Sequence, residues 1–473
     1  MPKILMITVG SSHQPIVTAI RSLQADRVVF ICSAGSKGTE TQVTGEGTPC
    51  EVRRTETIRI ALKPETDEES TFMEKLGLKD RFQPKRDSLV LMQIERLQNI
   101  PKQAGLGDRF DPNRDLILIQ EPDDLSECYQ KASSGIQAIH REFPDAQIMA
   151  DYTGGTKSMS VGLAMAALDY QATLYVTTGN RTNIIKVDRG ELTAQAVVAP
   201  LVAQRTIEQF LPIVLQQYNY PAAIAELKRL LSSMALPSET KRQIQDLYGC
   251  CSGLDAWDRF EHEEALQLLE PQMKRSEIKQ LVIFLKQVIS SRGQIDKNFD
   301  ASNGINGHGY EIVQDLLLNA ERRASQERYD DAVGRLYRAL ELLVQIHLLK
   351  IHKIKTGDVD TQQLPEPLRD EYEKMQSPDK CKIQLGLKNS YELLSKLPND
   401  MLGKLYLEKA KKILNALETR NNSLFAHGFQ PITGSDYQKV SEVIVNFVQS
   451  GIAAVISSKS KSQALQFPTT LQI

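Results

Sequence analysis

Residues 146–160 have the sequence AQIMADYTGGTKSMS, which indicates a strand, a turn and a helix in succession. An apolar run ends at Asp151, the pair Gly154–Gly155 permits a tight turn, and small residues after Lys157 are typical of a closely packed helix. Such a turn presents free backbone N–H groups and the positive end of the helix dipole to an anion. Because a lysine stands beside these groups, we expect a ligand that carries phosphate.

Strand-like and helix-like segments alternate through the first two hundred residues, which favours a mostly parallel, doubly wound α/β sheet. A near repeat (GLKDRFQPKRD at Gly77–Asp87, GLGDRFDPNRD at Gly105–Asp115) is interpreted as a local duplication that lengthens one connection. A hairpin of Ile184–Val187 and Leu192–Val198 is expected to close the domain. The expected strands are Ile4–Val9, Arg27–Cys32, Thr57–Leu62, Leu116–Ile119, Gln147–Asp151 and Ala172–Val176, with helices at Pro15–Leu23 and Leu125–Phe143.

From about Thr206 onwards the pattern is almost entirely helical. The expected features are short amphipathic helices from Ile207 to Val288, a polar linker at Ser290–Gly309, a basic loop from His352 to Pro378, and helices at Tyr329–Leu349, Ile383–Leu397, Leu402–Phe425 and Asp436–Ser457. The end of the chain after Lys459 is expected to fray. We therefore expect an α/β domain over residues 1–200, a helical connecting domain over 201–300, a helical bundle over 301–460 and a tail over 461–473.

Composition and charge limit the kind of protein. The 473 residues are 41% hydrophobic and 25% charged, as in an ordinary soluble protein of two or three domains. A formal net charge of −2 means that a nucleic acid would be bound by a local patch or a dimer groove. The apolar start of the chain is typical of a first strand, and no apolar stretch reaches the length of a membrane span. The six cysteines show no disulfide or zinc spacing, so reduced thiols in a cytoplasmic protein are expected.

Two turns are candidates for one ligand site. DYTGGTKS (Asp151–Ser158) is not a Walker A loop, since Thr156 rather than glycine precedes Lys157. The turn after the first expected strand, TVGSSHQP (Thr8–Pro15), has no GxGxxG but is rich in small hydroxyl residues. Two such turns at the carboxyl edge of one sheet form a crevice of the kind that binds ligands in doubly wound folds. The alternative, that the glycines only permit a tight turn, stays open here.

A second candidate site lies in ETRNNSLFAHG (Glu418–Gly428). Arg420 and His427 are seven residues apart, almost two helical turns, so we expect them to share one helix face, with Gly428 just past the helix end. The alternative is a surface arginine and a capping histidine. His347 lies on the apolar stripe of its expected helix and is expected in the core. No group of His, Asp and Glu has the spacing of metal ligands, so no metal site is expected.

Both motifs resemble those of known families. DYTGGTKS resembles the ligand-binding turn of the CRISPR-associated Rossmann-fold (CARF) sensor domains, and RNNSLFAH resembles the arginine–six residues–histidine motif of HEPN ribonuclease domains. YDDAVGRLYRALELL (Tyr329–Leu343) is similar to the helix that packs beside that motif. In order and length the whole chain is similar to the CARF–HEPN ribonucleases of type III CRISPR systems. The duplicated segment departs from a minimal sensor domain.

The resemblance implies a homodimer in which two Rossmann-like CARF domains bind a cyclic oligoadenylate, foremost cyclic tetra-adenylate, as an allosteric activator. It implies that Arg420 and His427 of a helical HEPN domain cleave single-stranded RNA through attack of a 2′-hydroxyl, without metal or cofactor. The products would carry a 2′,3′-cyclic phosphate and a 5′-hydroxyl, and Asn421 would orient the pair. The residues implied for the activator are Gly10, Ser11, Ser12, His13, Thr153, Gly154, Gly155, Thr156 and Lys157.

Three alternatives remain open from the sequence. The chain could be a non-catalytic ligand sensor joined to a helical interaction module, in which case the activator would bind without RNA cleavage. It could instead be a nucleotide-hydrolysing α/β enzyme with a helical lid, which the missing Walker glycine disfavours. Finally, a sensor domain that also cleaves its own activator is compatible with the ribonuclease interpretation.

Overall fold

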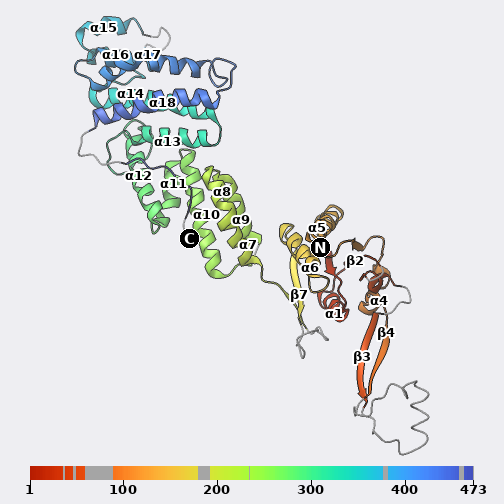
Figure 1. Ribbon diagram of the computed structural model, residues 1–473. Helices are drawn as coiled ribbons and strands as arrows, with labels where there is room; N and C mark the ends of the chain where they lie inside the picture. Colours follow the sequence, from red (N-terminus) through yellow and green to blue (C-terminus); the bar gives the residue numbers. More distant parts are fainter. Residues whose placement is uncertain are drawn as a thin grey trace, which may run out of the picture. The chain divides into compact units, whose positions relative to one another are not determined.

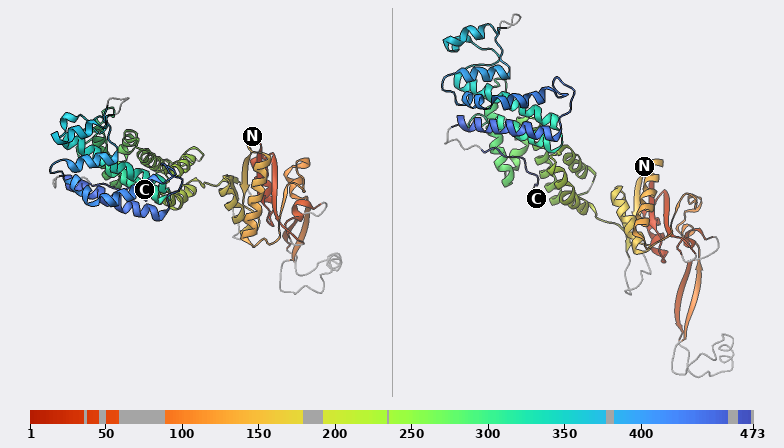
Figure 2. Two further views of the ribbon diagram at one scale, coloured as in Figure 1. Left: turned by 90° about the horizontal axis from the view of Figure 1, so that it is seen from above. Right: turned by 45° about the horizontal axis from the view of Figure 1, so that its top comes forward.

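The computed structural model describes residues 1–35, 38–45, 50–58, 89–178, 192–233, 235–376, 382–456 and 463–471. The chain divides into two compact units, Met1–Val198 and Ala199–Ile473 (Figures 1 and 2). The first unit contains both strands and helices, and the second is helical. Among the described residues, no helix combines the length and apolar character that crossing a membrane requires.

A six-stranded sheet forms the centre of the first unit, with the order β5-β2-β1-β6-β7-β8. Five neighbouring strands are parallel, and β8 pairs antiparallel with β7. The α/β sheet expected from the sequence is therefore confirmed. Its strands are β1 (Lys3–Thr8), β2 (Arg27–Ser33), β5 (Leu116–Ile119), β6 (Gln147–Asp151), β7 (Thr173–Thr178) and β8 (Leu192–Gln195).

Helices cover both faces of this sheet, which explains why β1 is apolar along its whole length. Leu5 and Ile7 pack in one core cluster with the apolar side of α1 (Gln14–Leu23). Ile4 and Met6, on the opposite face, pack in a second cluster with α5 (Leu125–Glu142) and α6 (Lys157–Asp169). Burying each such side chain contributes about 1.5–3 kcal/mol. The two clusters hold the carboxyl ends of the central strands in fixed positions.

The segment between β2 and β5 differs from the expectation of a strand at Thr57–Leu62. Instead β3 (Cys50–Ile58) pairs antiparallel with β4 (Leu89–Leu97) in a separate two-stranded ribbon (Figure 1). Antiparallel strands need no helical crossover, so two strands close in sequence can pair with each other rather than join the parallel sheet. A strand at β4 was not expected from the sequence, and residues 59–62 lie outside the described residues.

Only one copy of the near repeat can be placed, because Gly77–Asp87 lies outside the described residues. The other copy contains the short 3-10 helix Gly107–Arg109, follows α4 (Ile100–Ala104) and leads into β5. Its last residue, Asp115, is buried and accepts a hydrogen bond of 2.7 Å from Arg27 Nε. This copy therefore anchors β5 beside β2. Of the expected hairpin, Ile184–Val187 lies outside the described residues, and the second arm is β8.

The second unit consists of helices that pack side by side. In its C-terminal part α14 contacts α13, α16 and α18, and α17 contacts α16 and α18 (Figure 1). The helices are α7 (Ala199–Arg205), the π-helix Thr206–Phe210, α8 (Leu211–Gln216), α9 (Tyr220–Ser233), α10 (Ser238–Asp258), α11 (His262–Leu269), the 3-10 helix Glu270–Gln272, α12 (Ser276–Gly293), α13 (Glu311–Ser325), α14 (Tyr329–His352), the 3-10 helix Thr361–Gln363, α15 (Glu366–Glu373), α16 (Leu387–Lys396), α17 (Met401–Asn421) and α18 (Gly434–Val455). The expected loop from His352 to Pro378 thus contains a 3-10 turn and α15.

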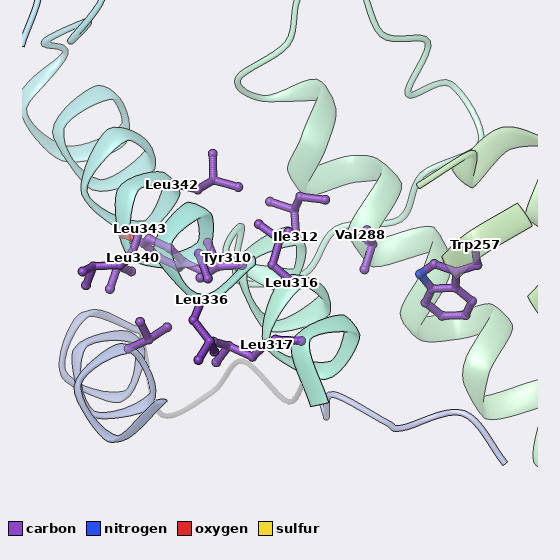
Figure 3. Packing of buried hydrophobic residues seen from close by; sticks show 14 of the residues in the cluster. Trp257, Val288, Tyr310, Ile312, Leu316, Leu317, Leu336, Leu340, Leu342 and Leu343 are labelled. Carbon is purple, nitrogen blue, oxygen red and sulfur yellow. The ribbon is translucent and has the colours of Figure 1, made fainter. Parts of the chain in front are cut away.

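One hydrophobic cluster runs through the whole second unit (Figure 3). It joins Trp257 of α10 and Val288 of α12 to Leu316 of α13 and Leu340 of α14. The polar stretch Ser290–Gly309 is therefore not a linker between separate units. It folds back on α12, where the Ile305 N–H donates to the Lys286 carbonyl at 3.0 Å.

The end of the chain packs into this unit as well, so the expectation of a frayed tail is wrong for residues 463–471. Phe467 is 3% exposed, and its ring centroid lies 4.9 Å from that of Trp257. The guanidinium carbon of Arg322 lies 3.7 Å from the Phe467 ring centroid, and Arg322 Nη1 donates to Gln466 Oε1 at 2.8 Å. A single aromatic residue in a polar segment gives no periodic signal, which is why the sequence did not predict this contact.

Candidate functional site

The two candidate turns lie side by side at the point where the strand order of the sheet reverses. β1 and β6 are parallel neighbours, and Ile7 is paired with Asp151 at their carboxyl ends. From β1 the chain continues to β2 on one side, whereas from β6 it continues to β7 on the other. The connections therefore diverge at the position where doubly wound sheets form a crevice for a ligand. The structure brings Gly10–His13 and Thr153–Lys157 together there.

Two glycines allow the turns to touch. A Cβ on Gly10 would lie 2.7 Å from the Gly155 nitrogen, and a Cβ on Gly154 would collide with the Thr8 carbonyl oxygen. Gly155 itself has a φ of +84°, which other residues rarely adopt. The Gly154 carbonyl accepts hydrogen bonds of 2.7 Å from the hydroxyls of Thr8 and Ser160. These contacts hold the turn in one conformation without the help of a ligand.

The helix that follows the glycine turn begins at Lys157. Thr156 is its N-cap, because Thr156 Oγ1 accepts from the Met159 N–H at 3.2 Å and donates to the Pro122 carbonyl. The amides of Lys157 and Ser158 have no acceptor within the helix, and the Lys157 side chain is exposed. Backbone N–H groups, the helix dipole and a lysine thus meet at one place, which suits an anion.

The other residues predicted to bind the ligand differ in whether their side chains are exposed and free of other hydrogen bonds. Thr153 Oγ1 already accepts from the Thr177 N–H at 2.7 Å, so its hydroxyl shapes the turn. Ser11 is exposed, while Ser12 and His13 are half-buried at the start of α1. Burial lowers the pKa of His13, which favours a neutral imidazole at neutral pH.

A buried polar group beneath the crevice was not among the predicted site residues. Asp151 Oδ1 accepts from the Thr153 N–H at 2.9 Å, and Oδ2 accepts from the Thr177 hydroxyl at 3.1 Å. The Thr177 hydroxyl lies 2.8 Å from that of Thr193. Burial raises the pKa of Asp151. A polar residue at the end of an apolar strand was the signal for Asp151, whereas Thr177 and Thr193 lie on other strands and gave none.

The second candidate site lies at the end of α17, and here the expected geometry is wrong. The helix ends at Asn421, so Arg420 and His427 do not share a helix face, and Gly428 does not cap the helix. Two asparagines and a serine favour local hydrogen bonds over continued helix. The chain forms a tight loop in which the His427 N–H donates to the Asn421 carbonyl at 3.1 Å. His427 thus still lies at the negative end of the helix dipole.

Contacts within the loop and with α14 position the functional side chains. The Gly428 N–H donates to the Ser423 carbonyl at 3.1 Å, and a bridge pairs Ser423 with Gln430. The guanidinium carbon of Arg420 lies 4.4 Å from the ring centroid of Tyr337 on α14. Arg420 Nη1 also donates to Asn421 Oδ1 at 3.2 Å. Arg420 is therefore held, while the His427 side chain is exposed.

Exposed apolar side chains surround this loop. Leu424 is 62% exposed, Phe425 75% and Phe429 87%. Large apolar side chains that cluster in solvent mark an interaction surface rather than a solvated loop.

These features define a class of protein with an α/β unit in which two adjacent turns suit an anion and a helical unit that carries an arginine–histidine loop. Residues 302–450 match the family model described as the Csm6 HEPN domain, and this region contains Tyr337, Arg420 and His427. The CRISPR system endoribonuclease Csm6 of Thermus thermophilus is 24% identical over 337 residues, which cover 63% of this chain and 68% of that protein. These matches support the interpretation that the chain is similar to the CARF–HEPN ribonucleases of CRISPR systems, of which Csm6 is one. This homology supports ribonuclease activity.

Solved structures show weaker likeness. Enterococcus italicus Csm6 bound to cyclic hexa-2′-fluoro-hexa-dAMP matches with a TM-score of 0.45 and 12% identity, over 96% of this chain and 95% of that chain. Can2 from Sulfobacillus thermosulfidooxidans in complex with cyclic tetra-adenylate matches with a TM-score of 0.18 and 12% identity, over 57% of this chain and 68% of that chain.

Proposed function

We propose that this protein is an endoribonuclease that a cyclic oligoadenylate, foremost cyclic tetra-adenylate, switches on by binding the α/β units of a homodimer. One observation carries the proposal: a single chain contains both the paired turns at the sheet's reversal point and the Arg420–His427 loop within a region that matches a HEPN domain. An α/β sensor and a ribonuclease in one chain imply that the ligand of one controls the other.

The crevice suits a ligand with repeated phosphates. The backbone N–H groups of Gly154, Gly155 and Thr156, together with the Lys157 ammonium, would bind phosphate and ribose. Ser11, Ser12 and His13 would contact an adenosine. Because the Thr153 and Thr156 hydroxyls already have partners, we assign these two residues a backbone role. A two-fold symmetric pair of crevices would present the same groups to each half of a cyclic ligand.

The loop at the end of α17 suits metal-independent cleavage of RNA. A ribose 2′-hydroxyl would attack the adjacent phosphorus, and the bond to the 5′-oxygen of the next nucleotide would break. His427 would transfer protons, and Arg420 would stabilise the negative charge that builds on the phosphoryl oxygens. Asn421 would position Arg420 through the hydrogen bond described above. The products would carry a 2′,3′-cyclic phosphate and a 5′-hydroxyl.

The surroundings of the loop support both a second subunit and single-stranded RNA. The exposed Leu424, Phe425 and Phe429 would be covered by the same loop of a partner, which would place two copies of Arg420 and His427 at one site. Lys404 and Lys411 are exposed on the same helix as Arg420 and would attract the RNA backbone.

The test is cleavage of single-stranded RNA with and without cyclic tetra-adenylate or cyclic hexa-adenylate. We expect strong stimulation by one of them, loss of cleavage in His427→Ala, and an unchanged ligand-induced rise in melting temperature in that variant. Full stimulated cleavage by His427→Ala would refute the catalytic assignment. Ligand binding by the wild-type protein without any RNA cleavage would instead favour a non-catalytic sensor.

A further inference from the structure

Two histidines and an aspartate meet where the C-terminal end of α14 reaches the N-terminus of α17. His347 Nε2 lies 2.7 Å from Asp400 Oδ2, and His352 Nε2 lies 2.8 Å from the same oxygen. The three potential ligand atoms are all within 4.8 Å of one another. The lack of metal-ligand spacing along the sequence therefore did not exclude such a group in the folded chain. No sequence motif indicates the cluster, because Asp400 is about fifty residues from the two histidines along the chain.

His347 is buried, as expected from its place on the apolar stripe, but its ring belongs to this polar cluster. The Tyr310 hydroxyl lies 2.9 Å from His347 Nδ1, which turns Nε2 toward Asp400. Asp400 Oδ1 accepts from the Gly403 N–H at 2.7 Å as the N-cap of α17, which leaves Oδ2 for the histidines. Groups that fix the orientation of each ligand in this way are typical of metal sites.

Charge and access also suit a cation. The side chains of His347 and Asp400 are 4% and 3% exposed, whereas that of His352 is 21% exposed. The cluster therefore has a carboxylate in its interior and one side open to solvent.

We propose that His347, His352 and Asp400 bind a divalent transition-metal ion, with Zn²⁺ the best fit, through the two Nε2 atoms and Oδ2. Two imidazoles and one carboxylate are a donor set that zinc accepts, with water as the fourth ligand from the open side. Ligand atoms around a tetrahedral zinc lie about 3.3 Å apart, so the cluster would open by about 0.5 Å to admit the ion.

The ion would have a structural role. Asp400 begins α17 and Arg420 lies one residue before its end, so about 30 Å of helix separates the cluster from the proposed catalytic loop. A metal here would join α14 to α17, the two helices that contribute Tyr337 and Arg420. The proposal is therefore independent of the proposed cleavage chemistry, which uses no metal.

The experiment uses the full-length protein after treatment with a chelator. Zn²⁺ affinity is measured by competition with a chromophoric chelator, and Co²⁺ is added as a spectroscopic probe of coordination. We expect one tight site per chain, an absorption spectrum of tetrahedral Co²⁺, and a higher melting temperature with Zn²⁺. His352→Gln is the main variant because its partly exposed side chain permits folding, with His140→Gln on α5 as the matched control.

Affinity for Zn²⁺ should fall at least about tenfold in His352→Gln and in Asp400→Asn, and remain unchanged in His140→Gln. Tyr310→Phe keeps all three ligands but removes the group that orients His347, and should weaken binding about tenfold. Absence of a tight site in the wild-type protein, or equal affinity in His352→Gln, would overturn the proposal. Far-ultraviolet circular dichroism establishes that each variant is folded.

Discussion

Arg420 illustrates how a single neighbour prepares a functional side chain. Its guanidinium lies over the Tyr337 ring, 4.4 Å from the centroid, and its Nη1 donates to Asn421 Oδ1. Such a cation–π contact is worth about 0.5–2 kcal/mol, depending on desolvation. Tyr337 therefore restricts the orientations of the Arg420 side chain.

Replacing Tyr337 should affect cleavage through the position of Arg420. We expect Tyr337→Leu to lower the activator-saturated cleavage rate about two- to thirtyfold, because the ring is lost, whereas Tyr337→Phe keeps the ring and should cleave almost like the wild type. Single-turnover cleavage measures the rate, and thermal unfolding controls for stability. Wild-type cleavage by Tyr337→Leu would show that the contact does not position the arginine.

The positions of the site residues were predicted more accurately at the turn that follows a strand than at the loop that follows a helix. At Asp151 and Gly154 an apolar strand determined where the turn begins, and the structure places that turn beside Gly10 as expected from a parallel sheet. At Arg420 the regular spacing to His427 indicated one helix face, yet the helix ends at Asn421. Backbone hydrogen bonds of a tight loop position His427, rather than helical periodicity. The spacing of residues along the sequence does not predict these hydrogen bonds.

At the level of elements, the junction of α14 and α17 depends on one carboxylate. The pKa of Asp400 falls from an ordinary 3.8 to about 2. Because the folded-state pKa is depressed, the stabilisation is fully present above about pH 4 and is lost as the pH falls toward 2. A shift of this size corresponds to about 2 kcal/mol at most.

Asp400→Asn tests this junction without metal. In the presence of a chelator we expect the wild type to exceed the variant in free energy of unfolding by about 1–2 kcal/mol at pH 5, and the difference to shrink toward pH 2.5. Urea unfolding at several pH values measures it, and the other carboxylates cancel because both proteins contain them. A difference that does not change with pH would contradict the assignment.

The pairing of β3 with β4 shows that the hydrophobic pattern of a strand does not determine which strand lies beside it. The strand expected at Thr57–Leu62 was predicted to join the parallel sheet. Thr57 and Ile58 instead belong to β3, which pairs antiparallel with β4. The same run can pair in either sheet, since its pattern records which residues are apolar and not which strand lies beside them. The strands flanked by recognised helices, such as β1 and β6, had no such ambiguity.

For the whole molecule, the division into an α/β unit and a helical unit was predictable from periodicity. The packing of the C-terminal segment against the helical unit was not predictable in this way. Phe467 packs against Trp257 and beneath Arg322, within the core of the helical unit. The C-terminal segment therefore links α10 and α13. These contacts join residues that are far apart along the chain, so no local sequence pattern predicts them.

Phe467→Ala should destabilise the helical unit by about 3 kcal/mol, because a buried aromatic side chain is removed and a cavity remains. Leu201→Ala is the matched control, since Leu201 is 62% exposed and should change stability by less than about 0.5 kcal/mol. Denaturant unfolding of the full chain measures both. Equal stability of Phe467→Ala and the wild type would mean that the C-terminal segment is not part of the core.

The central claim is that a ligand bound by the α/β unit controls the cleavage of RNA by the helical unit. The most direct measurement is the rate of RNA cleavage against cyclic tetra-adenylate concentration for the wild type, Lys157→Ala and His427→Ala. We predict stimulated cleavage by the wild type, the same maximum at a higher ligand concentration for Lys157→Ala, and no cleavage at any concentration for His427→Ala. Cleavage by the wild type that neither this ligand nor cyclic hexa-adenylate changes would contradict the account.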